Sequence, residues 1–263
     1  MIQLRDYQEN AVNKIKAALK KSPRKKIICE MPTGGGKTVI FSYIIHNAEA
    51  KGTRTIILTD RDELLKGTGG TLNDFGINVN YVKAGANTPP KHGNTFVCMV
   101  QTLRNRISDE KWMHWINSCN FFIIDECHKG DFDVFFEQNI FSKHTVIGFS
   151  ATPMRTGKQI QLSNCYDEIV HTLTTKQLIK KGFLCAEMYY GVEAPNLQGV
   201  KKNSKGDFDE NEMYKRYDKP NVYGGLVENL KTHAGFNCLI ASCDFGVLST
   251  LCGSSIMTKG FVA

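Results

Sequence analysis

The sequence lacks closely paired cysteines of the kind that bind zinc or iron–sulfur clusters. Its nine cysteines are spread over 263 residues, and no two of them form a C-x-x-C pair. Zinc ribbons and most cluster-binding motifs need such neighbouring thiols, so the sequence argues against both classes of site. An odd number of cysteines without a signal peptide also argues against a disulfide framework and favours free thiols in the reducing cytoplasm.

Long apolar runs and a hydrophobic leader are missing as well. The N-terminal segment MIQLRDYQENAV has no apolar signal-peptide core, and no stretch approaches the length of a membrane span. Hydrophobic residues still make up 41% of the chain, which is enough for a buried core. The net charge of +7 permits binding to nucleic acid but does not demonstrate it. We therefore expect a globular cytoplasmic protein without a membrane segment.

Short apolar segments alternate with helical or polar ones along the chain. A helical period is present over 4–19, and a further helix is predicted for 38–50. Segments rich in Val, Ile and Phe, typical of buried strands, occupy 25–30, 54–60, 94–100, 120–125 and 144–150. This order predicts an α/β fold with a mainly parallel sheet covered by helices on both faces. In such sheets, ligands bind beyond the carboxyl ends of the strands.

A glycine-rich segment, EMPTGGGKTVI, follows the first predicted strand. It matches the last three places of the phosphate-loop pattern G-x-x-x-x-G-K-[ST], whereas Met31 stands in the place of the first glycine. Consecutive glycines let backbone N–H groups converge on phosphate oxygens, and the following helix adds its positive N-terminal end. A glycine-rich turn before a helix is often only a turn, but Gly-Lys-Thr after a strand favours a nucleotide site.

A second segment, FFIIDECH, places two acids at the end of another predicted strand. The carboxylate of Asp125 can hold Mg²⁺, and that of Glu126 can orient and deprotonate an attacking water. Such a pair could also be a solubilising turn. Together with Gly-Lys-Thr upstream, it predicts an ATPase site.

Taken in order, these segments resemble the motifs of the superfamily 2 helicases and translocases of the DEAD/H-box type, whose second motif reads D-E-x-H. Over residues 1–185, LRDYQENAV resembles the Q-motif, MPTGGGKT motif I, ILTDRDELL motif Ia, VQTLRNR the next nucleic-acid-contacting motif, DECH motif II and SATPMR motif III. Members of this superfamily commonly lack the first glycine of motif I, so Met31 becomes a family trait. The resemblance implies a RecA-like P-loop NTPase domain that couples ATP hydrolysis to movement along nucleic acid, and it favours DNA over RNA.

The resemblance also implies a role for each matched residue. The implied ATP-binding residues are Arg5, Gln8, Thr33, Gly34, Gly35, Gly36, Lys37 and Thr38. The implied catalytic residues are Lys37, Asp125, Glu126 and His128, and Thr38 and Asp125 would hold Mg²⁺. The residues implied to line the nucleic-acid groove or to couple it to the ATP site are Arg61, Gln101, Thr102, Arg104, Ser150 and Thr152. For the two arginines of this last set, a solvated charge at the start of a helix is the alternative interpretation.

The motifs cover only one of the two RecA-like domains that such a motor uses. We expect an ATP-binding domain at 1–185, a polar linker at 186–222 and the start of a second α/β domain at 223–263. The string Q-x-x-G-R-x-x-R, which supplies arginine fingers from the second domain, does not occur in the sequence. The rest of that domain is therefore expected in a longer parent or in a partner chain, and this chain is expected to be a weak ATPase by itself.

Two other functions stay open. The chain could be a truncated remnant that only binds nucleotide or nucleic acid, although its catalytic residues are all present. It could also be the motor subunit of a restriction system, because QTL and DECH suit that branch too. Further helicase motifs in adjoining sequence would favour a helicase, and an adjoining nuclease domain a restriction enzyme.

Three further features carry expectations of their own. The glycine cluster KGTGGTL at 66–72 lacks both a Lys-Thr ending and an apolar strand directly before it, so we expect a loop. Trp112 and Trp115 lie three residues apart on a predicted helix, a spacing that favours core packing over base stacking. Arg155 would face either the nucleic acid or a neighbouring acid.

Overall fold

A computed structural model of the protein describes residues 3–21, 24–60, 62–155, 160–186, 197–201, 208–209, 212–213 and 215. The chain divides into two compact units, Met1–Cys185 and Ala186–Ala263. In the second unit, the backbone N–H of Lys201 donates to the carboxylate of Glu212 (3.0 Å). The predicted start of a second α/β domain, at 223–263, lies outside the described residues.

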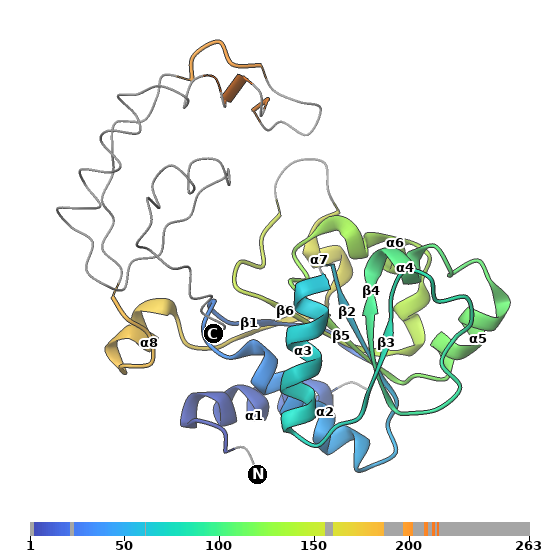
Figure 1. The fold of residues 1–263 in the computed structure, drawn as a ribbon. Coiled ribbons are helices and arrows are strands. Elements are labelled where there is room, and N and C mark those ends of the chain that lie inside the picture. Colours follow the sequence, from blue (N-terminus) through green and yellow to red (C-terminus); the bar gives the residue numbers. More distant parts are fainter. Residues whose placement is uncertain are drawn as a thin grey trace, which may run out of the picture. The chain divides into compact units, whose positions relative to one another are not determined.

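The first unit is built on a seven-stranded sheet in which every pair of neighbours is parallel (Figure 1). The strands are β1 (Lys26–Glu30), β2 (Thr55–Thr59), β3 (Val79–Val82), β4 (Thr95–Met99), β5 (Phe121–Asp125), β6 (Thr145–Ser150) and β7 (Glu168–His171). Their spatial order is β3-β4-β2-β5-β6-β1-β7. All five predicted strands are present, and the predicted α/β fold with a parallel sheet is confirmed. The two short outer strands, β3 and β7, were not predicted.

Helices connect the strands and cover both faces of the sheet (Figure 1). They are α1 (Asp6–Lys21), α2 (Lys37–Glu49), α3 (Asp62–Asp74), α4 (Val100–Arg104), α5 (Glu110–Asn117), α6 (Asp133–Glu137), α7 (Leu162–Cys165) and α8 (Thr175–Lys180), with 3₁₀ turns η1 (Gly130–Phe132) and η2 (Ile140–Lys143). Some begin at recognisable caps: the carboxylate of Asp109 accepts from the first turn of α5, and Thr174 forms a capping box with Gln177 at α8. Among the described residues, every helix is too short or too polar to span a bilayer.

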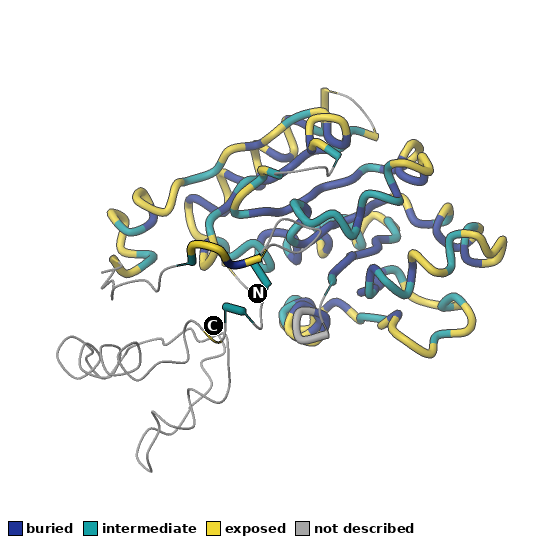
Figure 2. Tube along the Cα trace, turned by 90° about the horizontal axis from the view of Figure 1, so that it is seen from above, coloured by how far each residue is buried: buried dark blue, intermediate teal, exposed yellow. Residues whose placement is uncertain are grey.

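Two hydrophobic clusters, one on each face of the sheet, form the core. Side chains alternate between the faces, as the pleat of a strand requires: in β1, Ile27 and Cys29 join the cluster under α1, α2 and α3, while Ile28 joins the opposite one. The opposite cluster includes both Trp112 and Trp115, whose rings meet edge to face at 5.7 Å. The expectation that these two side chains pack in the core is therefore confirmed. Figure 2 shows the buried strands as the central layer.

The prediction of a loop at 66–72 is wrong. These residues lie inside α3, which runs from Asp62 to Asp74 in spite of three glycines. Leu65 and Leu72, two turns apart, are buried in the cluster that they share with α1 and α2. Burial of one face of a helix can outweigh the weak helix propensity of glycine, and it does so here.

Candidate ATP site

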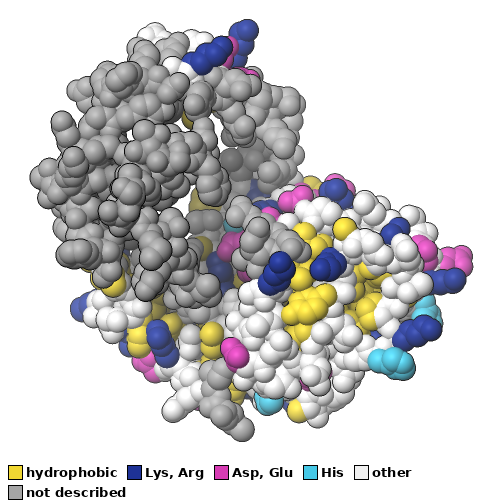
Figure 3. All heavy atoms as spheres, in the orientation of Figure 1, with side chains coloured by type: hydrophobic (Ala, Val, Ile, Leu, Met, Phe, Trp, Pro, Cys, Tyr) yellow, Lys and Arg dark blue, Asp and Glu magenta, His cyan; other side chains and the backbone are white. Residues whose placement is uncertain are grey.

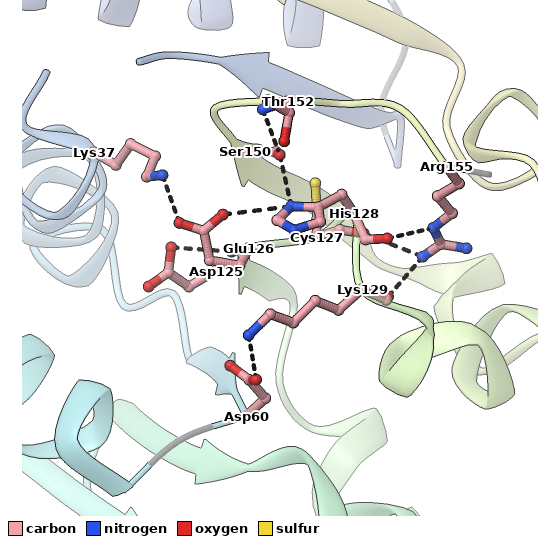
Figure 4. A network of polar contacts seen from close by, with 10 residues as sticks. All are labelled: Lys37, Asp60, Asp125, Glu126, Cys127, His128, Lys129, Ser150, Thr152 and Arg155. Carbon is pink, nitrogen blue, oxygen red and sulfur yellow. Dashed lines mark hydrogen bonds and ion pairs between the residues drawn. The ribbon is translucent and has the colours of Figure 1, made fainter. Parts of the chain in front are cut away.

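Three neighbouring strands carry the motifs with the strongest chemical signal. In the order β5-β6-β1, their carboxyl ends lead into the acidic pair, the serine–threonine segment and the glycine-rich loop. Because the strands are parallel, all three segments emerge at the same edge of the sheet. The structure thus brings together Lys37, Asp125, Glu126, His128, Ser150 and Thr152 (Figure 4).

The glycine-rich loop has the backbone that its composition predicts. Gly34 and Gly36 adopt φ angles of 75° and 82°, in the left-handed region that favours glycine. Gly36 is the residue directly before α2, so Lys37 and Thr38 are the first residues of that helix. Thr33 and Gly34 are exposed. Backbone N–H groups at the start of a helix, on a loop without Cβ atoms, form a cradle for an anion.

Met31 fills space that the loop would otherwise leave open. Its side chain is buried, and its backbone N–H donates to the carbonyl of Ser150 (2.9 Å). A Cβ atom on Gly35 would lie 2.8 Å from the Cγ atom of Met31. Met31 therefore packs directly against the loop, in a place where the usual pattern has a glycine.

The start of α1 lies against the same loop. The hydroxyl of Tyr7 donates to the carbonyl of Gly35 (3.0 Å), and a Cβ atom on Gly36 would lie 2.4 Å from the side-chain nitrogen of Gln8. The other end of the Gln8 amide accepts from the backbone N–H of Arg5 (3.0 Å). These contacts place the Q-motif residues beside the cradle.

Phe183 also lies beside the Q-motif residues, and the sequence alone did not identify it. The Arg5 guanidinium lies 4.9 Å from the centre of the Phe183 ring, and the Tyr7 ring lies at the same distance on a tilted plane. The residue follows α8, more than 170 positions after the Q-motif. A lone aromatic after a helix carries no signal in the sequence, so only the tertiary contact identifies it.

The acidic pair is arranged around Lys37. Its Nζ atom lies 2.6 Å from a carboxylate oxygen of Glu126, and both side chains are mostly buried. Asp125 is the last residue of β5 and is 6% exposed. Burial raises the pKa of Asp125 to about 6, helped by the neighbouring Glu126 and Asp60 and opposed by Lys37. A buried carboxylate that resists ionisation is one that a divalent cation would stabilise.

Glu126 has an unusual backbone. Its φ angle of 49° lies in the left-handed region, which few residues other than glycine adopt. This conformation turns the chain sharply after β5 and is a local strain of the kind that clusters at functional sites. Cys127, next along, is completely buried, and its N–H donates to the carbonyl of Phe149 in β6 (3.0 Å).

His128 connects the acidic pair to the segment after β6. Its Nδ1 atom is 2.8 Å from the Ser150 hydroxyl, which also accepts from the N–H of Thr152 (3.1 Å). The same nitrogen is 3.4 Å from a carboxylate oxygen of Glu126. Burial lowers the pKa of His128, Glu126 opposes that shift, and Lys129, Lys37 and Arg155 add to it. The lowered pKa favours the neutral form of the imidazole.

Four residues predicted to contact nucleic acid follow β2, which neighbours the acidic strand β5, and β4, which lies one strand further out. Gln101 and Thr102, early in α4, are half-buried, and Gln101 donates to the carbonyl of Asp60 (3.4 Å). Arg104, at the end of α4, is exposed. Arg61 lies outside the described residues.

The surface charge visible in Figure 3 adds little evidence for a nucleic-acid site. On the face of the described part that Figure 3 shows, Lys and Arg side chains are scattered among acidic and apolar ones and do not gather in one patch. On that face, charge alone therefore does not indicate where nucleic acid would bind.

Comparisons with known proteins identify the family of the chain. Residues 1–155 match the family described as "Type III restriction enzyme, res subunit". The chain is 30% identical over 223 residues to the Saccharomyces cerevisiae protein named "Putative ATP-dependent helicase IRC3", covering 78% of this chain and 31% of that protein. It is 24% identical over 208 residues to a 51.5 kDa protein of Lactococcus phage 7-9, covering 78% of this chain and 41% of that one. The chain thus spans less than half the length of either relative.

Two solved structures share the fold. One is a nuclease-deletion mutant of the Type ISP restriction-modification enzyme LlaGI in complex with a DNA substrate mimic, with a TM-score of 0.53 and 17% identity over 69% of this chain and 21% of that one. The other is the helicase domain of Pyrococcus furiosus Hef, with a TM-score of 0.52 and 20% identity over 64% of this chain and 38% of that one. These two structures show the fold alone. The family match and the similarity to the yeast protein confirm the resemblance to superfamily 2.

Proposed function

Since the chain belongs to the family of the res subunit of type III restriction enzymes, we propose that it is the ATP-binding part of a motor that moves along nucleic acid. One observation carries the proposal. The glycine-rich cradle, the Asp125–Glu126 pair and the Ser150–Thr152 segment emerge side by side from β1, β5 and β6. Parallel sheets bind nucleotides at this edge.

The residues fit ATP and Mg²⁺. A Cβ atom on Gly36 would meet Gln8, so the cradle has no room for a larger residue there, and α2 begins directly behind it. The Thr38 hydroxyl and the Asp125 carboxylate are hard oxygen donors, which Mg²⁺ prefers in combination with phosphate oxygens. ATP bound there would supply the phosphoanhydride bond whose hydrolysis drives movement. Arg5 and Gln8 would contact the adenine.

The Lys37–Glu126 ion pair indicates how the catalytic residues change partners. A phosphate group at the cradle would attract Lys37 away from Glu126. The freed Glu126 carboxylate could then orient the attacking water and accept its proton. His128 lies within reach of both Glu126 and Ser150, so it would pass changes at the ATP site to the segment after β6.

DNA is the nucleic acid that we propose. LlaGI, which shares the fold, was solved with a DNA substrate mimic. Arg61, Gln101, Thr102 and Arg104 would contact its phosphates, which position a strand without reading its sequence.

The family description also favours a second candidate, the motor of a restriction system. A nuclease domain adjoining this region would identify that case.

The cytoplasm is the proposed location, supported by the free state of the six cysteines that the structure describes.

An ATPase assay with and without single- and double-stranded DNA and RNA tests the proposal. We expect Lys37→Ala to abolish ATP binding and Glu126→Gln to keep binding while reducing hydrolysis by roughly 10²–10⁴-fold, the usual contribution of a general base. Lys51→Ala is the matched control, because Lys51 is exposed just beyond the far end of α2. If Lys37→Ala and Glu126→Gln behave like Lys51→Ala, the site has been misassigned.

A further inference from the structure

Arg155 lies at the end of the segment SATPMR, and its side chain is only 1% exposed. A charged side chain is rarely buried so completely unless its partners compensate for the loss of water. The acidic partner is Asp133, the first residue of α6, at 2.6 Å. The charge of Arg155 is thus neutralised inside the protein and does not face nucleic acid.

The remaining donors of Arg155 go to backbone carbonyls. Its Nε atom donates to His128 (2.7 Å), and Nη2 donates to Cys127 (3.2 Å) and Lys129 (2.7 Å). Nη1 donates to the carbonyl of Ile160 (2.8 Å) as well as to the carboxylate of Asp133. A guanidinium has five N–H donors in a fixed plane, and all five are used here. Figure 4 shows the side chain against the residues that follow Glu126.

Three consecutive carbonyls held by one side chain fix the backbone of residues 127–129. Glu126 and His128, the acid and the histidine of the proposed site, lie directly before and within this segment. Glu126 has a strained left-handed backbone, which persists only where neighbouring contacts enforce it. The side chain of Lys129 restrains the segment further, because it forms an ion pair with Asp60 beyond the end of β2.

We propose that Arg155 is a positioning residue for ATP hydrolysis. It holds the loop after β5 so that Glu126 and His128 keep their orientation, and it joins that loop rigidly to the segment after β6. This inference rests on the proposed ATPase function. A lysine in the same place has only three N–H donors, all on one nitrogen and without a planar fork, so it cannot serve all five acceptors.

Single-turnover hydrolysis and ATP·Mg²⁺ affinity, measured on the full chain carrying Arg155→Lys, test the inference. Misplacement of catalytic groups by about 1 Å can cost about 10²-fold in rate. We therefore expect hydrolysis to slow by about 10–100-fold and the Kd for ATP·Mg²⁺ to change by no more than about threefold, because the cradle is untouched. Arg54→Lys is the matched control: Arg54 is also a hydrogen-bonded, part-buried arginine, contacting Ser118 just before the amino end of β2. It should leave both quantities within about twofold.

The outcomes separate the possible failures. If wild type hydrolyses ATP and folded Arg155→Lys does so at the same rate, or if rate and affinity fall together in proportion to the unfolded fraction, the positioning role is refuted. Arg155→Gln serves as the second variant if Arg155→Lys does not fold. If neither folds while Arg54→Lys does, Arg155 is a structural residue and the inference is again refuted. If wild type neither binds nor hydrolyses ATP, the proposed function itself has failed.

Discussion

The imidazole of His144 is almost completely buried just before β6, where its ring meets that of Phe122 at 4.9 Å. Burial lowers the pKa of His144 from its ordinary value of 6.5, and Lys143 and Arg24 add to the effect. A hydrogen bond to the backbone of Cys119 opposes it. The folded protein therefore resists protonation of a group that the unfolded chain protonates freely.

A lowered histidine pKa makes stability depend on pH in a defined direction. The stabilising contribution of neutral His144 is present in full above pH 6.5 and is lost as the pH falls through the lower pKa of the folded state. His144→Asn, whose amide can still donate to Cys119 but cannot be protonated, should lose less stability than wild type between about pH 7 and about pH 5. Urea denaturation at the two pH values measures this. His114→Asn, at an exposed histidine of α5, is the control, and an equal loss in wild type and His144→Asn would contradict the expectation.

Individual site residues were predictable to the extent that a sequence motif names them. The motifs single out Lys37, Asp125, Glu126 and His128, and the structure brings these four side chains together at the sheet edge. Their roles in catalysis stay predictions. The buried setting of Arg155 was not predictable, because its five acceptors are backbone carbonyls and an acid from three different segments. Phe183 was missed for the same reason.

At the scale of elements, buried strands were predictable and outer ones were not. β2, β4 and β5 are apolar runs buried on both faces, and composition alone indicates such strands. β3 and β7 have four residues each, several of them polar and partly exposed. They are held by pairing with β4 and β1, which a local pattern cannot show.

Helix α3 offers a test of why a glycine-rich segment is helical. Cβ atoms added at Gly67 and Gly70 would meet nothing within 4 Å, whereas one at Gly69 would lie 1.9 Å from the Tyr81 hydroxyl. Gly67→Ala and Gly70→Ala should each raise the free energy of unfolding by about 0.5–1 kcal/mol, since alanine loses less backbone entropy in a helix.

Gly69→Ala serves as the comparison within the same helix. This substitution brings the same increase in helix propensity, but Tyr81 must move to make room for the methyl group. The net change in the free energy of unfolding should therefore be smaller than at Gly67 or Gly70, or negative. Chemical denaturation of the three variants measures the difference. Equal stabilisation by all three substitutions would show that the contact with Tyr81 has no effect on stability. If neither Gly67→Ala nor Gly70→Ala stabilises the protein, the low helix propensity of glycine does not limit the stability of α3.

At the scale of the whole molecule, we expect the 263-residue chain to bind ATP·Mg²⁺ but to hydrolyse it slowly and not to unwind a duplex. The sequence contains no Q-x-x-G-R-x-x-R string. Arginine fingers contribute roughly 10³–10⁵-fold in related phosphoryl-transfer systems. Steady-state ATPase and strand-displacement assays check this, with Glu126→Gln as the measure of contaminating activity. Rapid turnover stimulated by nucleic acid would contradict the expectation.

The strand order also bears on how the protein is made. β1, which leads into the phosphate cradle, pairs with β6 and β7, and its register with β6 begins at Lys26 and Val146. Some 115 residues separate the end of β1 from the start of β6, which at about 5–20 residues per second is roughly 6–23 s of synthesis on the ribosome. During that interval the backbone N–H and C=O groups along the edges of β1 have no native strand to pair with. The nascent chain must therefore keep β1 from pairing with strands of other chains until β6 and β7 have been translated.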